Sequence, residues 1–137
     1  MEQSSYTYFE RMPGSEQTIG ELLLEPTRIY MEALAVIQKA DVHGMAHITG
    51  SGLLKLHRIS GFGFEIDDPI EPQPIFRFLQ EEGGVAEDEM YRTFNMGMGW
   101  VFVLSEDDVD AVLKMTDGKV VGEIVDEGLR LGDMELK

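Results

Sequence analysis

The chain has 137 residues, of which 43% are hydrophobic, so its length and composition fit one compact globular domain. Its formal net charge of -15, from 26 acidic and 11 basic residues, argues against nucleic acid or an anionic membrane as a partner, because both select basic surfaces. The absence of cysteine excludes disulfides, thiolate catalysis and cysteine-ligated metal sites.

Residues 1–18 are predicted to form a loosely held leading segment, because they contain Pro13-Gly14-Ser15 and few aliphatic side chains. Tyr6, Tyr8 and Phe9 nevertheless indicate that something packs there. Either the segment abuts another domain, or it forms a short helix that folds back on the same core. The chain shows no secretory signal and no run of about 18 apolar residues, so we expect a soluble, cytoplasmic protein.

The next predicted element is a helix over residues 26–40. Proline suits its first turn, and Ile29, Leu34 and Ile37 recur at roughly helical spacing. The stretch 41–44 ends in Gly44 and is expected to stop this helix.

Short strand and helix patterns alternate through the rest of the chain. We predict strands at 46–49, 62–66, 100–104 and 120–125, and helices at 75–80, 86–94 and 106–115, with a turn at 81–84. Ser105 is the expected N-cap of the last helix. This order predicts an α+β fold, a layered α/β sandwich with a mixed sheet of at least four strands.

Two glycine-containing loops are the candidate ligand site. In the first, Gly50 and Gly52 allow backbone N–H groups to converge on an anion, and Thr49 and Ser51 add hydroxyl groups, so phosphate is the natural guest. The loop lacks the Gly-Lys-Ser/Thr ending of a Walker loop and the spacing of a dinucleotide fingerprint. On pattern alone, an ordinary structural glycine turn is the favoured alternative.

The second loop contains Gly97 and Gly99, which predict a close approach to the backbone, presumed here to be by a ligand. Arg92 precedes it and offers a guanidinium for a phosphate, while the amide of Asn95 could read a donor and an acceptor on a small molecule. An ion pair between the arginine and an acidic residue at 87–88 is an equally good account.

His47 lies two residues before the first loop, where an imidazole could bind substrate or carry a proton near pH 7. Its spacing favours a buried, satisfied histidine. His43 and His57 add no zinc-like spacing, so we predict no metal site, and His57 is read as a surface residue. Arg28 is either an anion contact or a cation near a helix start, which hints at a partner.

Three stretches together carry a family resemblance: LLLEPTRIY at 22–30, HGMAHITGSGL at 43–53 and EMYRTFNMGMG at 89–99. In order and spacing they resemble the C-terminal domain of AIR synthetase, phosphoribosylformylglycinamidine cyclo-ligase. The resemblance extends from about residue 19 to residue 125. It implies that residues 19–137 form an AIR synthetase C-terminal-like domain, and that the family's N-terminal ATP-binding domain is absent from this chain.

Two departures from the family pattern border the first loop. Ser51 replaces the middle one of three glycines; serine keeps the backbone donor, adds a hydroxyl and is tolerable where φ is negative. Residues 54–59 depart from the family's Glu-Asn-x-Pro-Arg continuation, so either Lys55 or Arg58 is the candidate replacement for the lost arginine.

The resemblance implies a ligase of purine biosynthesis that uses ATP to close the imidazole ring of formylglycinamidine ribonucleotide, giving aminoimidazole ribonucleotide, ADP and phosphate. It implies catalytic roles for His47 and Asn95, and substrate or phosphate contacts from Thr49, Gly50, Ser51, Gly52, Arg92, Gly97 and Gly99. ATP and Mg²⁺ would bind mainly through the absent N-terminal domain, acting in cis or in trans. The family is dimeric largely through that domain, so for this chain either a homodimer or a monomer is expected.

The chain alone is therefore expected to be inactive. Two alternatives stay open at this point. One is a related ATP-dependent superfamily enzyme, such as formylglycinamidine ribonucleotide synthetase. The other is a stand-alone, non-catalytic domain that binds a nucleotide metabolite or a protein.

Overall fold

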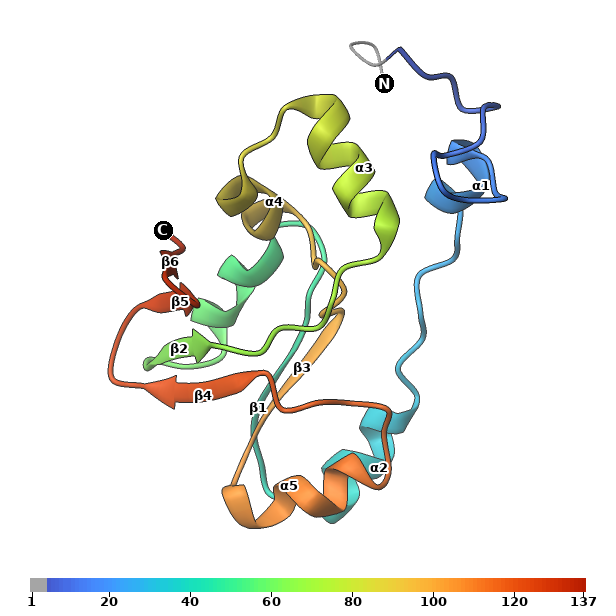
Figure 1. The fold of residues 1–137 in the computed structure, drawn as a ribbon. Coiled ribbons are helices and arrows are strands. Elements are labelled where there is room, and N and C mark those ends of the chain that lie inside the picture. Colours follow the sequence, from blue (N-terminus) through green and yellow to red (C-terminus); the bar gives the residue numbers. More distant parts are fainter. Residues whose placement is uncertain (1–4) are drawn as a thin grey trace.

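Two β-sheets organise residues 5–137, the part of the chain that the computed structural model describes (Figure 1). The smaller sheet pairs β1 (Val42–His47) antiparallel with β3 (Trp100–Leu104). The larger has the order β4-β2-β5-β6, formed by β4 (Gly122–Val125), β2 (Gly63–Ile66), β5 (Leu129–Leu131) and β6 (Met134–Glu135). Because β2 pairs antiparallel with β4 and parallel with β5, this sheet is mixed. The predicted α+β class with a mixed sheet of four strands is confirmed.

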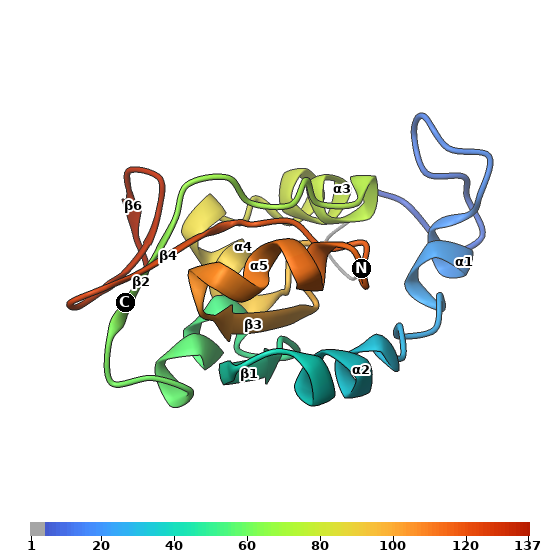
Figure 2. The same ribbon diagram turned by 90° about the horizontal axis from the view of Figure 1, so that it is seen from below.

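In the described part of the chain, five α-helices and one 3₁₀-helix surround the sheets. They are α1 (Ile19–Leu23), α2 (Glu32–Lys39), η1 (Gly52–Arg58), α3 (Pro74–Gly83), α4 (Glu87–Thr93) and α5 (Glu106–Leu113). The chain enters β1 from α2 and leaves β3 into α5. Since the two strands are antiparallel, α2 and α5 lie beyond the same end of the two-stranded ribbon (Figures 1 and 2).

The main hydrophobic core joins β1, η1, β2, α4 and the C-terminal strands. Its fully buried side chains include Ile48, Leu53, Leu56 and Met90. Burial of one such side chain contributes about 1.5–3 kcal/mol. The core therefore holds the end of β1, the start of η1 and the end of α4 together, which are the places from which the two glycine loops emerge.

A smaller cluster fastens the N-terminal part of the chain to α3. Met12 and Ile19 are buried there against Phe78. Thr18 and Glu21 form a capping box, because each side chain accepts a hydrogen bond from the other residue's backbone N–H. The described part of the leading segment thus packs on the chain's own surface and leads into the short helix α1, while residues 1–4 lie outside the described part.

The predicted helix over 26–40 is too long at its start. Residues 25–30 form no regular structure, and α2 begins only at Glu32. The reason is tertiary: Arg28 hydrogen-bonds with Asp117, 89 residues away, and Tyr30 packs on Trp100. These contacts hold the segment in a non-helical conformation.

The predicted glycine stop at 41–44 is also wrong. Gly44 lies within β1, at an irregularity in the register with β3, and the helix ends at the extended residue Ala40. Consequently β1 occupies 42–47 rather than 46–49.

Smaller differences concern element ends. Most of the predicted turn at 81–84 belongs to α3, which ends where Gly84 adopts φ 59°. Ser105 occupies the N-cap position of α5, but its side chain makes no capping hydrogen bond. β4 starts at Gly122 rather than residue 120, and β5 and β6 follow the strand that was predicted to be the last.

Candidate functional site

The two glycine loops are neighbours. The backbone N–H of Ile48 donates to the carbonyl of Gly99 over 2.8 Å, which ties the end of β1 to the start of β3. Gly52 packs on the end of α4, where an added Cβ would overlap the carbonyl oxygen of Tyr91 and lie 2.8 Å from that of Phe94. The loop 49–52 and the loop 95–99 therefore form one continuous region.

Lys55 places a cation in the first loop. Its Nζ donates to the carbonyl oxygen of His47 over 3.0 Å and to the Thr49 hydroxyl. Within residues 5–137 the lysine has no carboxylate partner, although the chain carries 26 acidic residues. A half-buried ammonium group that is not neutralised by the protein is suited to binding an anion.

Gly50 gives this region its open side. The residue is exposed, and a Cβ added to it would meet no atom within 4 Å. Thr49 is exposed as well, and its hydroxyl lies beside the lysine amine. Of the two glycines in this loop, Gly50 is the one that the chain's own packing does not require to be glycine.

Ser51 does not have the negative φ at which a serine is readily tolerated. Its φ is 77°, in the left-handed region, which costs a residue with a side chain about 1–2 kcal/mol. The loop therefore keeps the backbone conformation of a glycine position while carrying a hydroxyl group.

Ser51→Gly should accordingly raise the free energy of unfolding by about 0.5–1 kcal/mol, since relief of the left-handed strain exceeds the entropic cost of glycine. Urea unfolding at constant pH measures this. Ser105→Gly is the matched control, because Ser105 has φ -64° and should lose stability. A loss of stability in both variants would contradict the assigned conformation.

Asn95 shapes the second loop. Its Oδ1 accepts a hydrogen bond from the backbone N–H of Gly97 over 3.0 Å, and its carbonyl accepts one from Met98. Within residues 5–137 the side-chain amide nitrogen of Asn95 has no partner, so it is free to donate to a ligand. Met96 and Met98 are buried in the main core and fix the loop from beneath.

The close approach predicted at Gly97 and Gly99 comes from the chain itself. A Cβ at Gly99 would overlap the hydroxyl of Tyr30, and one at Gly97 would lie 3.2 Å from the carbonyl oxygen of Glu71. Gly97 also has φ 92°. Their glycine identity is therefore explained by packing and backbone conformation without a ligand.

His47 belongs to an aromatic cluster on β1 and β3. Its ring stacks on Trp100 with centroids 5.6 Å apart and meets Tyr30 edge-on at 5.7 Å. The side chain is half-buried, and neither ring nitrogen has a hydrogen-bond partner within residues 5–137. The prediction of a buried, satisfied histidine is therefore wrong, and the imidazole is held in place with its nitrogens available.

Arg92 and Arg28 differ in whether they are free to bind an anion. Arg92 lies loosely beside Glu89, with Nε and Oε2 3.9 Å apart, so its partner is not one of the acidic residues at 87–88. Arg28 is bound to Asp117 through two hydrogen bonds of 2.8 and 2.9 Å and also pairs with Glu32. The arginine lowers the pKa of the Asp117 carboxyl below its ordinary value. Arg28 is thus already neutralised, whereas Arg92 can turn to an anion.

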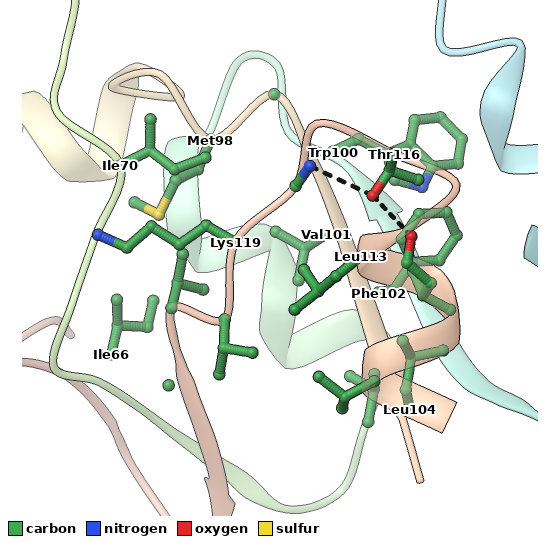
Figure 3. A pocket seen from close by; sticks show the side chains of 18 of the residues that line it. Ile66, Ile70, Met98, Trp100, Val101, Phe102, Leu104, Leu113, Thr116 and Lys119 are labelled. Carbon is green, nitrogen blue, oxygen red and sulfur yellow. Dashed lines mark hydrogen bonds between the residues drawn. The ribbon is translucent and has the colours of Figure 1, made fainter. Parts of the chain in front are cut away.

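A cleft of about 700 Å³ lies along β3, on the side of α5 and β4 (Figure 3). Gly97 and Gly99 line it, but most of its side chains are apolar. The Thr116 hydroxyl donates to the Val112 carbonyl, and Lys119 pairs with Asp68. Within the described residues Trp100 Nε1 is buried without a partner. This lining does not suit a phosphate. The region around Lys55 suits one better.

Two further findings concern metal sites and membrane spans in the described residues. Within residues 5–137 no group of three or more histidine or acidic residues is placed to hold a metal ion. No helix in the same range is both long enough and apolar enough to cross a membrane. His43 is exposed and lies 3.1 Å from Asp41, and His57 is a surface residue as predicted.

Comparison with known proteins shows the family of the chain that carries these loops. A family model described as "AIR synthase related protein, C-terminal domain" matches residues 2–133. The chain belongs to this family. It is 57% identical over 137 residues to the phosphoribosylformylglycinamidine cyclo-ligase of Methanococcoides burtonii, covering 99% of the chain and 41% of that protein.

Other relatives agree. The chain is 56% identical to the protein of the same name from Methanosarcina acetivorans and 46% identical to that from Thermococcus kodakarensis, covering 98% and 87% of this chain. It covers 40% and 37% of those two proteins, so it spans about two fifths of the length of its relatives. The AIR synthase-related C-terminal domain is therefore one part of a longer protein in these organisms.

Within this AIR synthase-related domain, the structure separates the two candidate replacements for the family's arginine. Lys55 reaches the first loop, whereas Arg58 is exposed at the end of η1 and makes no hydrogen bond or ion pair within the described residues. Sequence spacing alone could not make this distinction, because the direction of each side chain depends on the turn of the 3₁₀-helix.

Proposed function

We propose that this chain is the substrate-binding part of a phosphoribosylformylglycinamidine cyclo-ligase, completed by an ATP-binding domain in cis or in trans. The names of the relatives suggest the reaction, and the observation that carries the substrate side is Lys55. Its half-buried amine, without a carboxylate partner, lies beside the open backbone at Gly50. This arrangement supports binding of the phosphate of a ribonucleotide.

We propose that the remaining substrate contacts come from both loops. Thr49, Gly50, Ser51 and Gly52 would bind substrate from the first loop, and Arg92, Gly97 and Gly99 from the second. We assign Gly52, Gly97 and Gly99 the lesser role of backbone contacts, because their packing already accounts for glycine. Arg92 supplies a second cation, since its contact with Glu89 is long.

In the proposed reaction, ATP transfers its terminal phosphoryl group to the amide oxygen of formylglycinamidine ribonucleotide. An internal nitrogen then attacks the activated carbon, phosphate leaves, and the imidazole ring closes. His47 is the candidate acceptor for the proton lost by that nitrogen, because its ring nitrogens have no partner within residues 5–137. Asn95 is the candidate donor to the substrate through its free amide nitrogen.

ATP and Mg²⁺ belong to the other part of the proposed enzyme. The described residues offer no set of three carboxylate or histidine ligands for a metal ion. This chain would bind the ribonucleotide and thereby hold its internal nitrogen and its activated carbon in attack geometry.

The test measures ring closure from formylglycinamidine ribonucleotide and magnesium-ATP with two proteins. One is this chain alone. The other is a fusion in which this chain replaces the matching part of the Methanococcoides burtonii relative and follows that relative's preceding region. We expect turnover only in the fusion. A folded fusion that binds the ribonucleotide without turnover would favour a non-catalytic binding domain, and turnover of a different amide substrate would favour a related superfamily enzyme.

His47→Ala and Asn95→Ala should each lower kcat/KM of the fusion by at least about tenfold, or roughly 1.4 kcal/mol, without unfolding it. Asn95→Asp is the sharper variant, because it keeps an oxygen for the Gly97 N–H and removes the amide donor. His57→Ala, at an exposed histidine, is the matched control and should leave turnover unchanged. Native turnover in the His47 or Asn95 variants would remove those residues from the proposed site.

A further inference from the structure

Four large apolar side chains form an exposed strip on the segment before α2 and on α2 itself. Their exposed fractions are 78% for Ile29, 64% for Met31, 57% for Leu34 and 44% for Ile37. We call these four residues the outer strip. Monomeric soluble proteins rarely leave extended apolar patches uncovered, and such patches commonly mark interaction sites.

The anchoring of the neighbouring residues directs the outer strip away from the core. Arg28 is bound to Asp117, and Tyr30 packs on Trp100, so the side chains between and after them, Ile29 and Met31, are left on the other side of the open segment. Their exposure is therefore set by long-range contacts on the opposite side of the backbone.

The same separation continues into α2. Ala33 and Val36 are buried on one side of this helix, while Leu34 and Ile37, three residues apart, are exposed. Residues 31, 34 and 37 fall along one side of a helix. The helix thus carries a buried apolar side and a second apolar side that nothing in the described chain covers.

The position of the outer strip in the chain indicates what covers it. Among residues 5–137 there are 13 exposed large hydrophobic side chains, and nine of them lie between Tyr8 and Met45. The family model is that of a C-terminal domain, and the chain covers 41% or less of the relatives cited above. In those relatives more than half of the protein lies outside the match, and a C-terminal domain is joined to the rest through its N-terminal side.

Other occupants fit less well. A second copy would bring together two surfaces of chains that each carry a net charge of -15, which opposes association. A membrane-binding helix needs basic residues on its polar side, whereas α2 offers Lys39 alone and also carries Glu32.

We propose that the outer strip is the surface on which the preceding domain of the longer protein docks. This inference rests on that part of the proposed function which gives the chain a preceding domain, and it does not depend on the ring-closing chemistry. Docking would cover the apolar side of α2 and fix the segment at 25–31 between two domains, with Arg28 and Tyr30 facing one and the outer strip facing the other.

The test uses cysteine as a probe, because the chain contains none. Met31→Cys and Leu34→Cys are prepared in the chain alone and in the fusion described above, whose own cysteines are replaced. We expect maleimide to label both positions at least about tenfold more slowly in the fusion. Phe62→Cys is the matched control, since Phe62 is 62% exposed and lies outside the strip, so its labelling rate should be the same in both proteins.

Equal labelling of Met31→Cys and Leu34→Cys in the two proteins would overturn the proposal. Protection that is already present in the chain alone and grows with its concentration would overturn it in favour of a second copy. These outcomes are separate from those of the catalytic test. A fusion that is protected but inactive would support docking and contradict the proposed reaction. A fusion that is active but unprotected would support the reaction and contradict docking.

Discussion

Gly52→Ala should lower the free energy of unfolding by about 3 kcal/mol or more. Gly52 has φ 46°, a left-handed conformation that costs alanine about 1–2 kcal/mol. In addition, the new Cβ would overlap the Tyr91 carbonyl oxygen and crowd that of Phe94, which are backbone atoms that cannot rotate away. Forcing a methyl group into such a site costs a further 1–3 kcal/mol or so. Urea unfolding followed by circular dichroism measures the loss.

Gly50→Ala is the control for that experiment. It has no atom within 4 Å of the new Cβ and lies on the exposed side of the same loop, so its stability should stay within about 0.5 kcal/mol of the native value. The contrast identifies the role of each glycine. If both variants unfold at the native urea concentration, the packing of the loop on α4 is not as described.

Lys55→Met should lower kcat/KM of the active fusion by about 10- to 100-fold. The substitution keeps the length of the side chain but removes the charge that we propose binds the substrate phosphate, and a hydrogen bond to a charged group contributes about 1.5–3 kcal/mol. The effect should appear mainly in KM, because the ribose phosphate takes no part in the proposed bond changes and so contributes to ground-state and transition-state binding alike. Steady-state kinetics at several substrate concentrations separate the two parameters.

Two companion variants distinguish charge from structure. Arg58→Met removes a nearby cation that makes no contact with the loop and should change kcat/KM by less than about twofold. Lys55→Arg keeps the charge and should recover part of the affinity. Equal losses in Lys55→Met and Arg58→Met would mean that the charge of the region, and not the lysine itself, attracts the substrate. Equal losses in Lys55→Met and Lys55→Arg would point to the shape of the loop instead.

The elements that could be predicted are those with strong local patterns. β3 combines Trp100, Phe102 and branched aliphatic residues, and α5 follows directly with acidic residues in its first turn. Such signals act over a few residues, so the neighbouring sequence is sufficient to detect them. The same holds for the class of the fold, because the alternation of short strands and helices restricts how layers can form.

Contacts between distant residues account for most of the errors. The segment at 25–30 has a helical pattern, yet Arg28 and Tyr30 are held by partners near residues 117 and 100. β6 has two residues and follows a tight turn, and it exists because β5 offers a free edge. Neither arrangement leaves a periodic signal in the chain.

For the candidate site, the order of amino acids is enough to show which residue types are present: two glycine loops, a histidine before the first, and an arginine and an asparagine at the second. It is also enough to recognise the family, because three motifs occur in the family's order. What each residue is available to do depends on the folded arrangement. The structure shows that Gly52, Gly97 and Gly99 meet the chain's own atoms, whereas Gly50 does not. It also shows that Lys55 enters the loop and Arg58 does not. The physical reason is that the space around an atom and the partner of a charge depend on residues brought together by folding, and these lie too far apart along the chain for spacing to reveal them.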